Sequence, residues 1–181
     1  MKRQIIAVSL LMVASSVQFA NAAASDGTIN FTGAITAQTC TINVNNNGSS
    51  PSVTLPTVST AGMNAVGLTK GSTALNFALT ACAGTASNAS VFFQSGPGVT
   101  VNGTVANTAP GSSAATGIAL QINDSNNSPV TIGSSNQLTS GITPIASGNA
   151  SMAYTVQYVT TNSTPTAGMF AGAVTYSINY Q

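Results

Sequence analysis

Apolar and polar residues alternate near the start of the chain in a way that predicts an extended strand. Every second position of residues 27–35 is apolar or glycine. Side chains of a strand point alternately to its two faces, so these positions share one face that is meant to be buried. They are Gly27, Ile29, Phe31, Gly33 and Ile35. No hairpin partner lies next to this strand, so we expect it to pair with a sheet elsewhere, in the same molecule or in another.

Similar short alternations recur along the rest of the chain and predict an all-β fold. The clearest cover residues 39–44, 73–82, 117–123 and 150–160. Shorter or weaker strands are expected at 53–56, 90–94, 99–106 and 130–132. Residues 61–68 are the only candidate for a short helix or turn. Short strands with turn signals between them are typical of a two-sheet sandwich of immunoglobulin-like type.

The last predicted strand runs from Met169 to the end of the chain, and its two faces differ. The apolar face holds Phe170, Gly172, Val174, Tyr176, Ile178 and Tyr180. The polar face holds Thr175, Ser177 and Asn179. In a sandwich the terminal strand would often pair with a final edge strand, but the sequence stops at Gln181. We therefore expect one edge of this strand to lack a partner within the chain.

The first 22 residues have the pattern of a secretory signal peptide. Lys2 and Arg3 precede a predominantly apolar run over residues 5–14, which is too short to span a bilayer. Ala20 and Ala22 then supply the small residues that a signal peptidase reads, and cleavage after Ala24 is nearly as well supported. The chain is expected to be exported, and no later segment is long and apolar enough to anchor it in a membrane.

Charged side chains are almost absent after the predicted signal, which excludes several function classes. They are Lys70, Asp26 and Asp124, and the chain has no histidine. Without a basic patch, nucleic acid is not an expected partner. General acid–base catalysis needs histidine or carboxylates of tuned pKa, and metal sites need ligands of the same types. We therefore expect no enzyme activity, no metal and no cofactor.

The two cysteines predict one disulfide. Cys40 and Cys82 form an isolated pair in a chain that is expected to be exported. A bond between them would close a loop of 42 residues, which stabilises the fold by roughly 4 kcal/mol in the loop-entropy estimate. The alternative is two free buried thiols.

Several motifs together make the chain resemble a known family. The motifs are Asp-Gly-Thr-Ile-Asn-Phe-Thr-Gly-Ala-Ile at 26–35, the pair Cys40 and Cys82, Ala-Thr-Gly-Ile-Ala-Leu-Gln-Ile at 115–122, Gly168, and the penultimate Tyr180. With these motifs the chain resembles the major pilin, the shaft subunit of type 1-like fimbriae that are assembled by a periplasmic chaperone and an outer-membrane usher. One departure is the very low charge, because subunits of this family often carry more charged surface.

The resemblance implies both a fold and a way of assembling. The fold is an incomplete immunoglobulin-like sandwich that lacks its final strand and is completed by a donor strand from another molecule. Residues 23–36 would be the donor-strand extension and 37–181 the pilin domain. A chaperone would first fill the groove beside the C-terminal strand. The usher would then let the next subunit's extension replace it, in a fibre that also holds tip and adaptor subunits at the cell surface.

The resemblance also assigns residues to the two surfaces that meet. The donor strand would use Gly27, Ile29, Phe31, Gly33 and Ile35, with Gly33 where the groove is shallow. The groove and chaperone-binding strand would use Gly168, Phe170, Val174, Tyr176, Ile178, Tyr180 and Gln181.

Other readings remain open at this point. Residues 27–35 could be an ordinary first strand of the chain's own sandwich. The chain could also be a minor adaptor subunit of the same fibre, a sugar-binding tip adhesin or a self-contained secreted β-sandwich.

Overall fold

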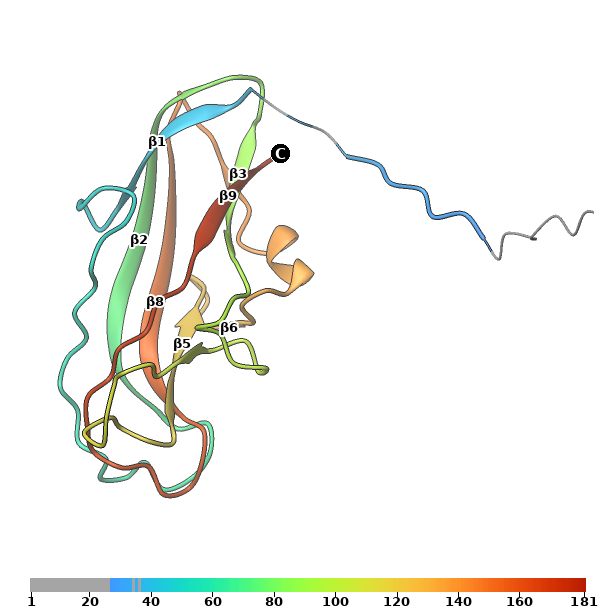
Figure 1. Ribbon diagram of the computed structural model, residues 1–181. Coiled ribbons are helices and arrows are strands. Elements are labelled where there is room, and N and C mark those ends of the chain that lie inside the picture. Colours follow the sequence, from blue (N-terminus) through green and yellow to red (C-terminus); the bar gives the residue numbers. More distant parts are fainter. Residues whose placement is uncertain (1–26, 34, 36) are drawn as a thin grey trace, which may run out of the picture. The chain divides into compact units, whose positions relative to one another are not determined.

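The computed structural model describes residues 27–33, 35 and 37–181 of the chain (Figure 1). The predicted signal peptide, residues 1–22, lies outside the described residues. The chain divides into two compact units, residues 1–34 and 35–181. Within the first unit, residues 27–33 belong to no strand, although their alternation predicts one. A strand forms only where its backbone bonds to a neighbouring strand, so the pattern alone does not produce one.

The second unit contains two antiparallel sheets. The larger sheet has the order β1-β2-β8-β5-β4, and β6 pairs with β5. In Figure 1 the long strands β2 and β8 lie side by side along the molecule, paired from Thr69 opposite Val159 to Leu79 opposite Ala150. The strands are β1 (Thr39–Val44), β2 (Thr69–Ala83), β4 (Val105–Ala106), β5 (Ile118–Asn123), β6 (Pro129–Val130) and β8 (Ala150–Thr160).

The smaller sheet has the order β7-β3-β9. Its strands are β3 (Asn88–Phe93), β7 (Thr143–Pro144) and β9 (Tyr176–Tyr180). β3 is central and pairs with β9 along the whole of β9, from Ala89 opposite Tyr180 to Phe93 opposite Tyr176. β7 pairs only with the start of β3. The short β7 leaves most of the second edge of β3 to be satisfied by other groups.

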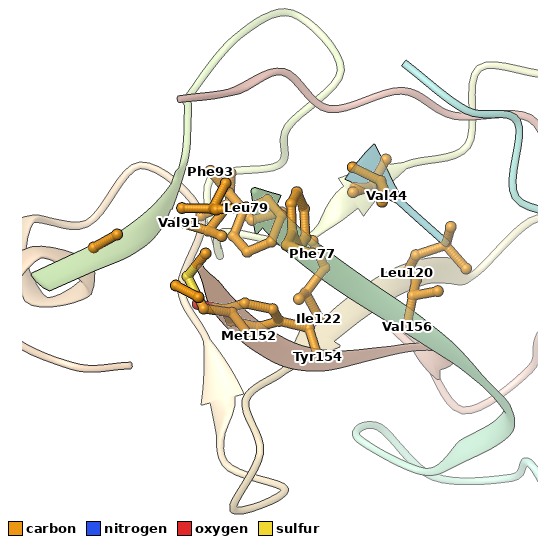
Figure 2. Packing of buried hydrophobic residues seen from close by; sticks show 14 residues of the cluster. Val44, Phe77, Leu79, Val91, Phe93, Leu120, Ile122, Met152, Tyr154 and Val156 are labelled. Atoms are coloured by element: carbon orange, nitrogen blue, oxygen red, sulfur yellow. The ribbon is translucent and has the colours of Figure 1, made fainter. Parts of the chain in front are cut away.

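One hydrophobic core lies between the two sheets (Figure 2). Phe77 of β2, Phe93 of β3 and Tyr154 of β8 pack their rings edge to face, with centroids 5.3 to 6.0 Å apart. Such pairs add about 0.5–1.5 kcal/mol each beyond the area they bury. Because the three rings come from both sheets, they fix the sheets against each other. This is the all-β sandwich that the sequence predicts.

The predicted disulfide is confirmed. Cys40 and Cys82 are bonded and join β1 to β2. Neighbouring strands of the larger sheet are thereby tied at one end. The loop between them carries residues 49–61, of which 49–53 and Leu55 line the groove described below.

Three predicted strands are shorter than expected or missing. β9 begins at Tyr176 and not at Met169, because its partner β3 ends at Phe93, opposite Tyr176. Residues 53–56 form no strand, although exposure still alternates there between half-buried Val53 and Leu55 and exposed residues. Residues 99–106 likewise form only β4 and one isolated bridge. Each segment has the side-chain pattern of a strand but has no neighbouring strand among the described residues to pair with along its whole length.

Of the two alternatives predicted for residues 61–68, a short helix or a turn, the structure forms the turn. Residues 61–68 form turns, because Gly62 and Gly67 have φ of +76° and +85°, values that a right-handed helix excludes. The one helix among the described residues is a short 3-10 turn, η1 (Ser135–Leu138), which the sequence did not predict. Its buried Gln137 reaches β3, so tertiary contacts rather than periodicity hold it in place.

Candidate binding groove

Strand β9 has one paired edge and one open edge. Toward β3, Gln181 and Asn88 exchange two backbone hydrogen bonds of 2.9 Å each. Bonded residues alternate along an antiparallel pair, so the backbone groups of Tyr176, Ile178 and Tyr180 point away from β3. These groups have no backbone partner among the described residues. β9 therefore presents a row of unused donors and acceptors, which is what another strand requires.

A groove with a volume of about 740 Å³ lies beside this edge. Residues 172–178 form one wall, and residues 49–53 with Leu55 form the other. No residue that lines the groove is charged. Half-buried apolar side chains border it, so the core is open to one side. Its floor comes from both sheets and consists of Ile42, Val44, Leu75, Phe77, Phe93, Val105, Leu120, Ile122 and Val156.

The wall opposite β9 is an irregular segment, residues 49–61, which we call the strap. Val53 and Leu55 line the groove, while Thr54 between them is exposed. Residues 50–59 make no backbone–backbone hydrogen bond to any part of the chain that the structure describes. The groove is therefore bordered on both sides by backbone that is not paired on the groove side.

Tyr176 connects the two walls. Its ring packs edge to face on Phe77, with centroids 4.9 Å apart, and its hydroxyl donates a 2.6 Å hydrogen bond to the Ser49 carbonyl. Burial raises the pKa of the Tyr176 hydroxyl above its ordinary value of 10.0. The hydroxyl consequently stays protonated at neutral pH and remains able to donate to the strap.

The end of the chain is held firmly beside the groove. One carboxylate oxygen of Gln181 accepts hydrogen bonds of 2.9 Å from the N–H groups of Ser87 and Asn88. The Gln181 side-chain amide donates to the Leu138 carbonyl of η1 at 2.9 Å. Burial also raises the pKa of the neighbouring Tyr180 hydroxyl. The last strand is thus fixed by its own final residue.

The structure brings some of the predicted groove residues together and separates others. Val174, Tyr176 and Ile178 line the groove, and Tyr180 continues the same face of β9. Phe170 instead packs its ring on Tyr158 of β8, with centroids 5.8 Å apart.

Gly168 also lies away from the groove lining. A Cβ atom at this position would stand 2.5 Å from both the Ala115 nitrogen and the Ser113 oxygen, which are backbone atoms that cannot easily move. Gly168 therefore lets the chain pass close to residues 113–115 before it reaches β9.

The predicted donor residues carry exposed apolar side chains. Ile29 is 79% exposed, Phe31 89% and Ile35 fully exposed. Gly33 has open space where a Cβ would stand. Three large apolar side chains in such a short segment form an exposed apolar stretch, a feature that marks interaction sites in soluble proteins.

Sequence reasoning missed the residues that hold the strap. Lys70 of β2 donates from its ammonium group to the carbonyls of Ser59 and Ala61. One signal was available, because Lys70 is the only basic residue after the predicted signal peptide and Gly71 follows it. The alternation at Val53 and Leu55 was noticed but predicted a strand rather than a groove wall.

Comparison with known proteins decides the family. The profile of the family described as fimbrial protein matches residues 29–181. This chain belongs to the fimbrial protein family. The fimbrial subunit is 35% identical over 175 residues to the major fimbrial subunit SMF-1 of Stenotrophomonas maltophilia, covering 93% of this chain and 99% of that protein. It is 29% identical to a type-1 fimbrial protein subunit of Serratia marcescens, with both chains covered completely.

A solved structure agrees in fold. The P pilus rod subunit PapA matches with a TM-score of 0.59 and 17% identity, over 78% of this chain and 99% of that one. The subunit has the immunoglobulin-like sandwich of pilins, which lacks one strand. It is a structural subunit of a surface fimbria and forms a filament with other subunits. None of the described residues forms a helix long and apolar enough to cross a membrane.

Proposed function

We propose that the subunit polymerises head-to-tail by donor-strand exchange, with residues 27–35 of one copy filling the groove of the next. The observation that carries this proposal is the open edge of β9 beside an uncharged apolar groove. The exposed alternation of Ile29, Phe31 and Ile35 supplies a matching strand. Residues 23–36 would then act as the donor extension and 37–181 as the pilin domain.

The physics of this pairing is the addition of a strand to a sheet edge. Main-chain hydrogen bonds to β9 give affinity, and every second side chain enters the groove. Residues 27–35 span roughly 30 Å when extended. Each of the three large donor side chains contributes on the order of 1.5–3 kcal/mol on full burial. Because donor and groove are different surfaces, the contact is head-to-tail, and it extends into an open filament when successive copies do not close into a ring.

The same groove explains why a helper would be needed before assembly. An open edge beside an exposed core is an aggregation hazard in the export compartment. We propose that a periplasmic chaperone covers it first, with a basic cleft on the Gln181 carboxylate, since charge-assisted hydrogen bonds are stronger than neutral ones. An outer-membrane usher would then exchange chaperone for donor. The relative named a major fimbrial subunit favours a place in the shaft.

The test removes the donor and returns it as a peptide. A variant that lacks residues 25–36 is expected to fold on its chaperone but to form no filament. A synthetic peptide of residues 25–36 should bind it with one-to-one stoichiometry. A peptide with Asn30→Ser, on the polar face, should bind equally well. A peptide with Gly33→Ile should fail, because a shallow pocket does not accept the added side chain. Filaments formed by the deletion variant would contradict the proposal.

A further inference from the structure

Hydrogen bonds to the rest of the described chain hold the strap only near its two ends, and those at its C-terminal end come from a single lysine. At the N-terminal end, the Ser49 carbonyl accepts a hydrogen bond from the Tyr176 hydroxyl across the groove. At the other end, the Lys70 ammonium donates to the Ser59 carbonyl at 3.3 Å and to the Ala61 carbonyl. Between these points, residues 50–59 have no backbone–backbone hydrogen bond within the described chain. Besides apolar packing, the position of this wall therefore depends on few hydrogen bonds.

A β-bulge explains why Lys70 can reach the strap. Lys70 is opposite Tyr158, and Thr73 is opposite Val156, so β2 carries one residue more than β8 between these pairs. Directly opposed residues have their side chains on the same face of a sheet, and bulges redirect side chains. Simple alternation back from Thr73 would put Lys70 on the outer face. The bulge turns it to the face of Tyr158, where the strap lies.

Gly71 in the same bulge lets the strap pack closely against β2. Its φ is +70°, and a Cβ there would stand 3.0 Å from Val58 Cγ1, 3.1 Å from Tyr158 Cδ2 and 3.3 Å from Pro56 Cγ. The strap thus packs directly over this glycine, beside the lysine that binds its carbonyls. Two adjacent residues of β2 therefore hold the C-terminal part of the strap: Gly71 by close packing and Lys70 by hydrogen bonds.

Lys70 is a charged residue in a chain with almost no other charges, and it has no carboxylate among its hydrogen-bond partners in the part of the chain that the structure describes. It is the only lysine or arginine among the described residues. Its hydrogen-bond acceptors are two backbone carbonyls rather than a carboxylate. Asp124, the other charged side chain in the described part of the chain, accepts hydrogen bonds from the N–H groups of Asn126 and Ser128 in its own loop. The ammonium is thus committed to the strap.

We propose that Lys70 is a positioning residue for assembly, which holds the strap at the distance from β9 that one incoming strand requires. This inference rests on the proposed donor-strand exchange. Without the ammonium the strap would sample positions closer to and farther from β9. The groove would then have the binding-competent width only part of the time, and the apparent association rate of a donor strand would fall in proportion to that fraction.

The test uses the full-length chain and a fluorescently labelled peptide of residues 25–36, at subunit concentrations too low for self-assembly. Lys70→Met keeps the length of the side chain but removes its donors, and it is expected to slow peptide association about tenfold, as for loss of hydrogen bonds from a charged group. Lys70→Arg should retain most of the rate. The double variant Lys70→Met with Ser72→Lys restores the net charge but places it at an exposed position. It should not restore the association rate, because the strap still lacks its hydrogen bonds.

A second measurement separates positioning from general loss of stability. Spin labels at Thr54 of the strap and Thr175 beside β9, both exposed, report the width of the groove directly. The wild type and Lys70→Arg should give one narrow distance distribution, and Lys70→Met a broad one. Tyr176→Phe, which keeps the ring on Phe77 but removes the bond to Ser49, should broaden it as well.

The outcomes are distinct. Slow association with a broad distribution in Lys70→Met, and near-normal values in Lys70→Arg, support the proposal. Equal association rates for the wild type and Lys70→Met overturn it. An equal fall in the thermal midpoint and the rate of both variants also overturns it, since Lys70 would then serve the fold alone. If the wild type binds no peptide, donor-strand exchange itself fails, and the positioning role fails with it.

Discussion

The two outer edges of the smaller sheet are treated in opposite ways. On the far side of β3, the backbone groups of Ala89, Val91 and Phe93 point away from β9, and each has a partner. Ala89 pairs with Thr143 of β7, and the Val91 N–H donates a hydrogen bond to the Tyr154 hydroxyl oxygen. The equivalent groups on the open edge of β9 have no backbone partner among the described residues.

Gln137 shows how carefully the β3 edge is closed. It is 4% exposed, and its side-chain amide makes the two hydrogen bonds that the backbone of a neighbouring strand would make. Its oxygen accepts the Phe93 N–H at 2.9 Å, and its nitrogen donates to the Phe93 carbonyl at 3.1 Å. A chain that uses a buried glutamine to satisfy one residue of β3 leaves a whole row open on β9. The difference favours the proposal that the open edge of β9 receives a strand from another molecule.

The largest expected effect comes from closing the open edge within one molecule. Moving residues 25–36 from their natural place to a short flexible linker after Gln181 lets the donor fill the groove of its own chain. We expect a monomer that no longer polymerises and is more stable by several kcal/mol, on the order of 5, from burial of Ile29, Phe31 and Ile35. Chemical denaturation and light scattering measure both properties. The same transfer with Gly33→Ile is the matched control and should gain little.

Removing the disulfide is expected to have the next largest effect. Replacing Cys40 and Cys82 together by serine should lower the free energy of unfolding by roughly 4 kcal/mol. The bond closes the loop that carries the strap, and without it the unfolded chain gains conformational entropy. The hydrogen bonds along the β3 edge do not depend on this bond. The yield of mature subunit in the export compartment measures the effect. A normal yield of assembled fibre from this variant would contradict it.

Opening the closed edge should cost less. Gln137→Ala leaves the Phe93 N–H buried without an acceptor, although the Phe93 carbonyl keeps the Gly133 N–H. We expect a loss of about 1–3 kcal/mol in the free energy of unfolding and more aggregation during refolding. Asn136→Ala, at an exposed neighbouring position, is a control for changes in η1. If Gln137→Ala unfolds with wild-type stability, the β3 edge does not depend on this residue.

The smallest effect concerns pH. The chain has no histidine, so stability should change little between about pH 6 and 9. Burial raises the pKa values of Tyr154, Tyr176 and Tyr180 above 10.0. Above about pH 10 the folded chain therefore keeps tyrosine protons that the unfolded chain releases. The free energy of unfolding keeps its full value below that pH and falls as the pH rises above it. Filling the groove buries Tyr176 and Tyr180 further, and the fall should become steeper. Identical alkaline profiles for filled and empty subunits would contradict this.

The sequence predicted best the elements whose partners lie inside the chain. β1, β5 and β8 follow the expected ranges closely, because each has one face in the core and a neighbour to pair with. The alternation at 53–56 and 170–175 gave the right inward-facing side chains but the wrong secondary structure. A strand needs backbone partners as well as a pattern, and a pattern does not say where those partners are.

Other features were outside the reach of pattern reasoning. The 3-10 turn η1 depends on contacts between Gln137 and β3 that are 44 residues apart in sequence. The role of Lys70 depends on a bulge that reverses its face, which simple alternation predicts wrongly. Gly168 was noticed as a motif, but its close approach to residues 113–115 is visible only in the structure.

The most direct test of the account compares the two edges by amide hydrogen exchange at single-residue resolution. In the isolated subunit, the N–H groups of Tyr176, Ile178 and Tyr180 should exchange rapidly, while those of Ala89 and Phe93 are protected. In the fibre, or with the peptide of residues 25–36 bound, the three β9 amides should become protected, and those of β3 should change little. β9 amides that stay unprotected in the fibre, or are already protected in the isolated subunit, would contradict the claim that this edge receives the donor strand.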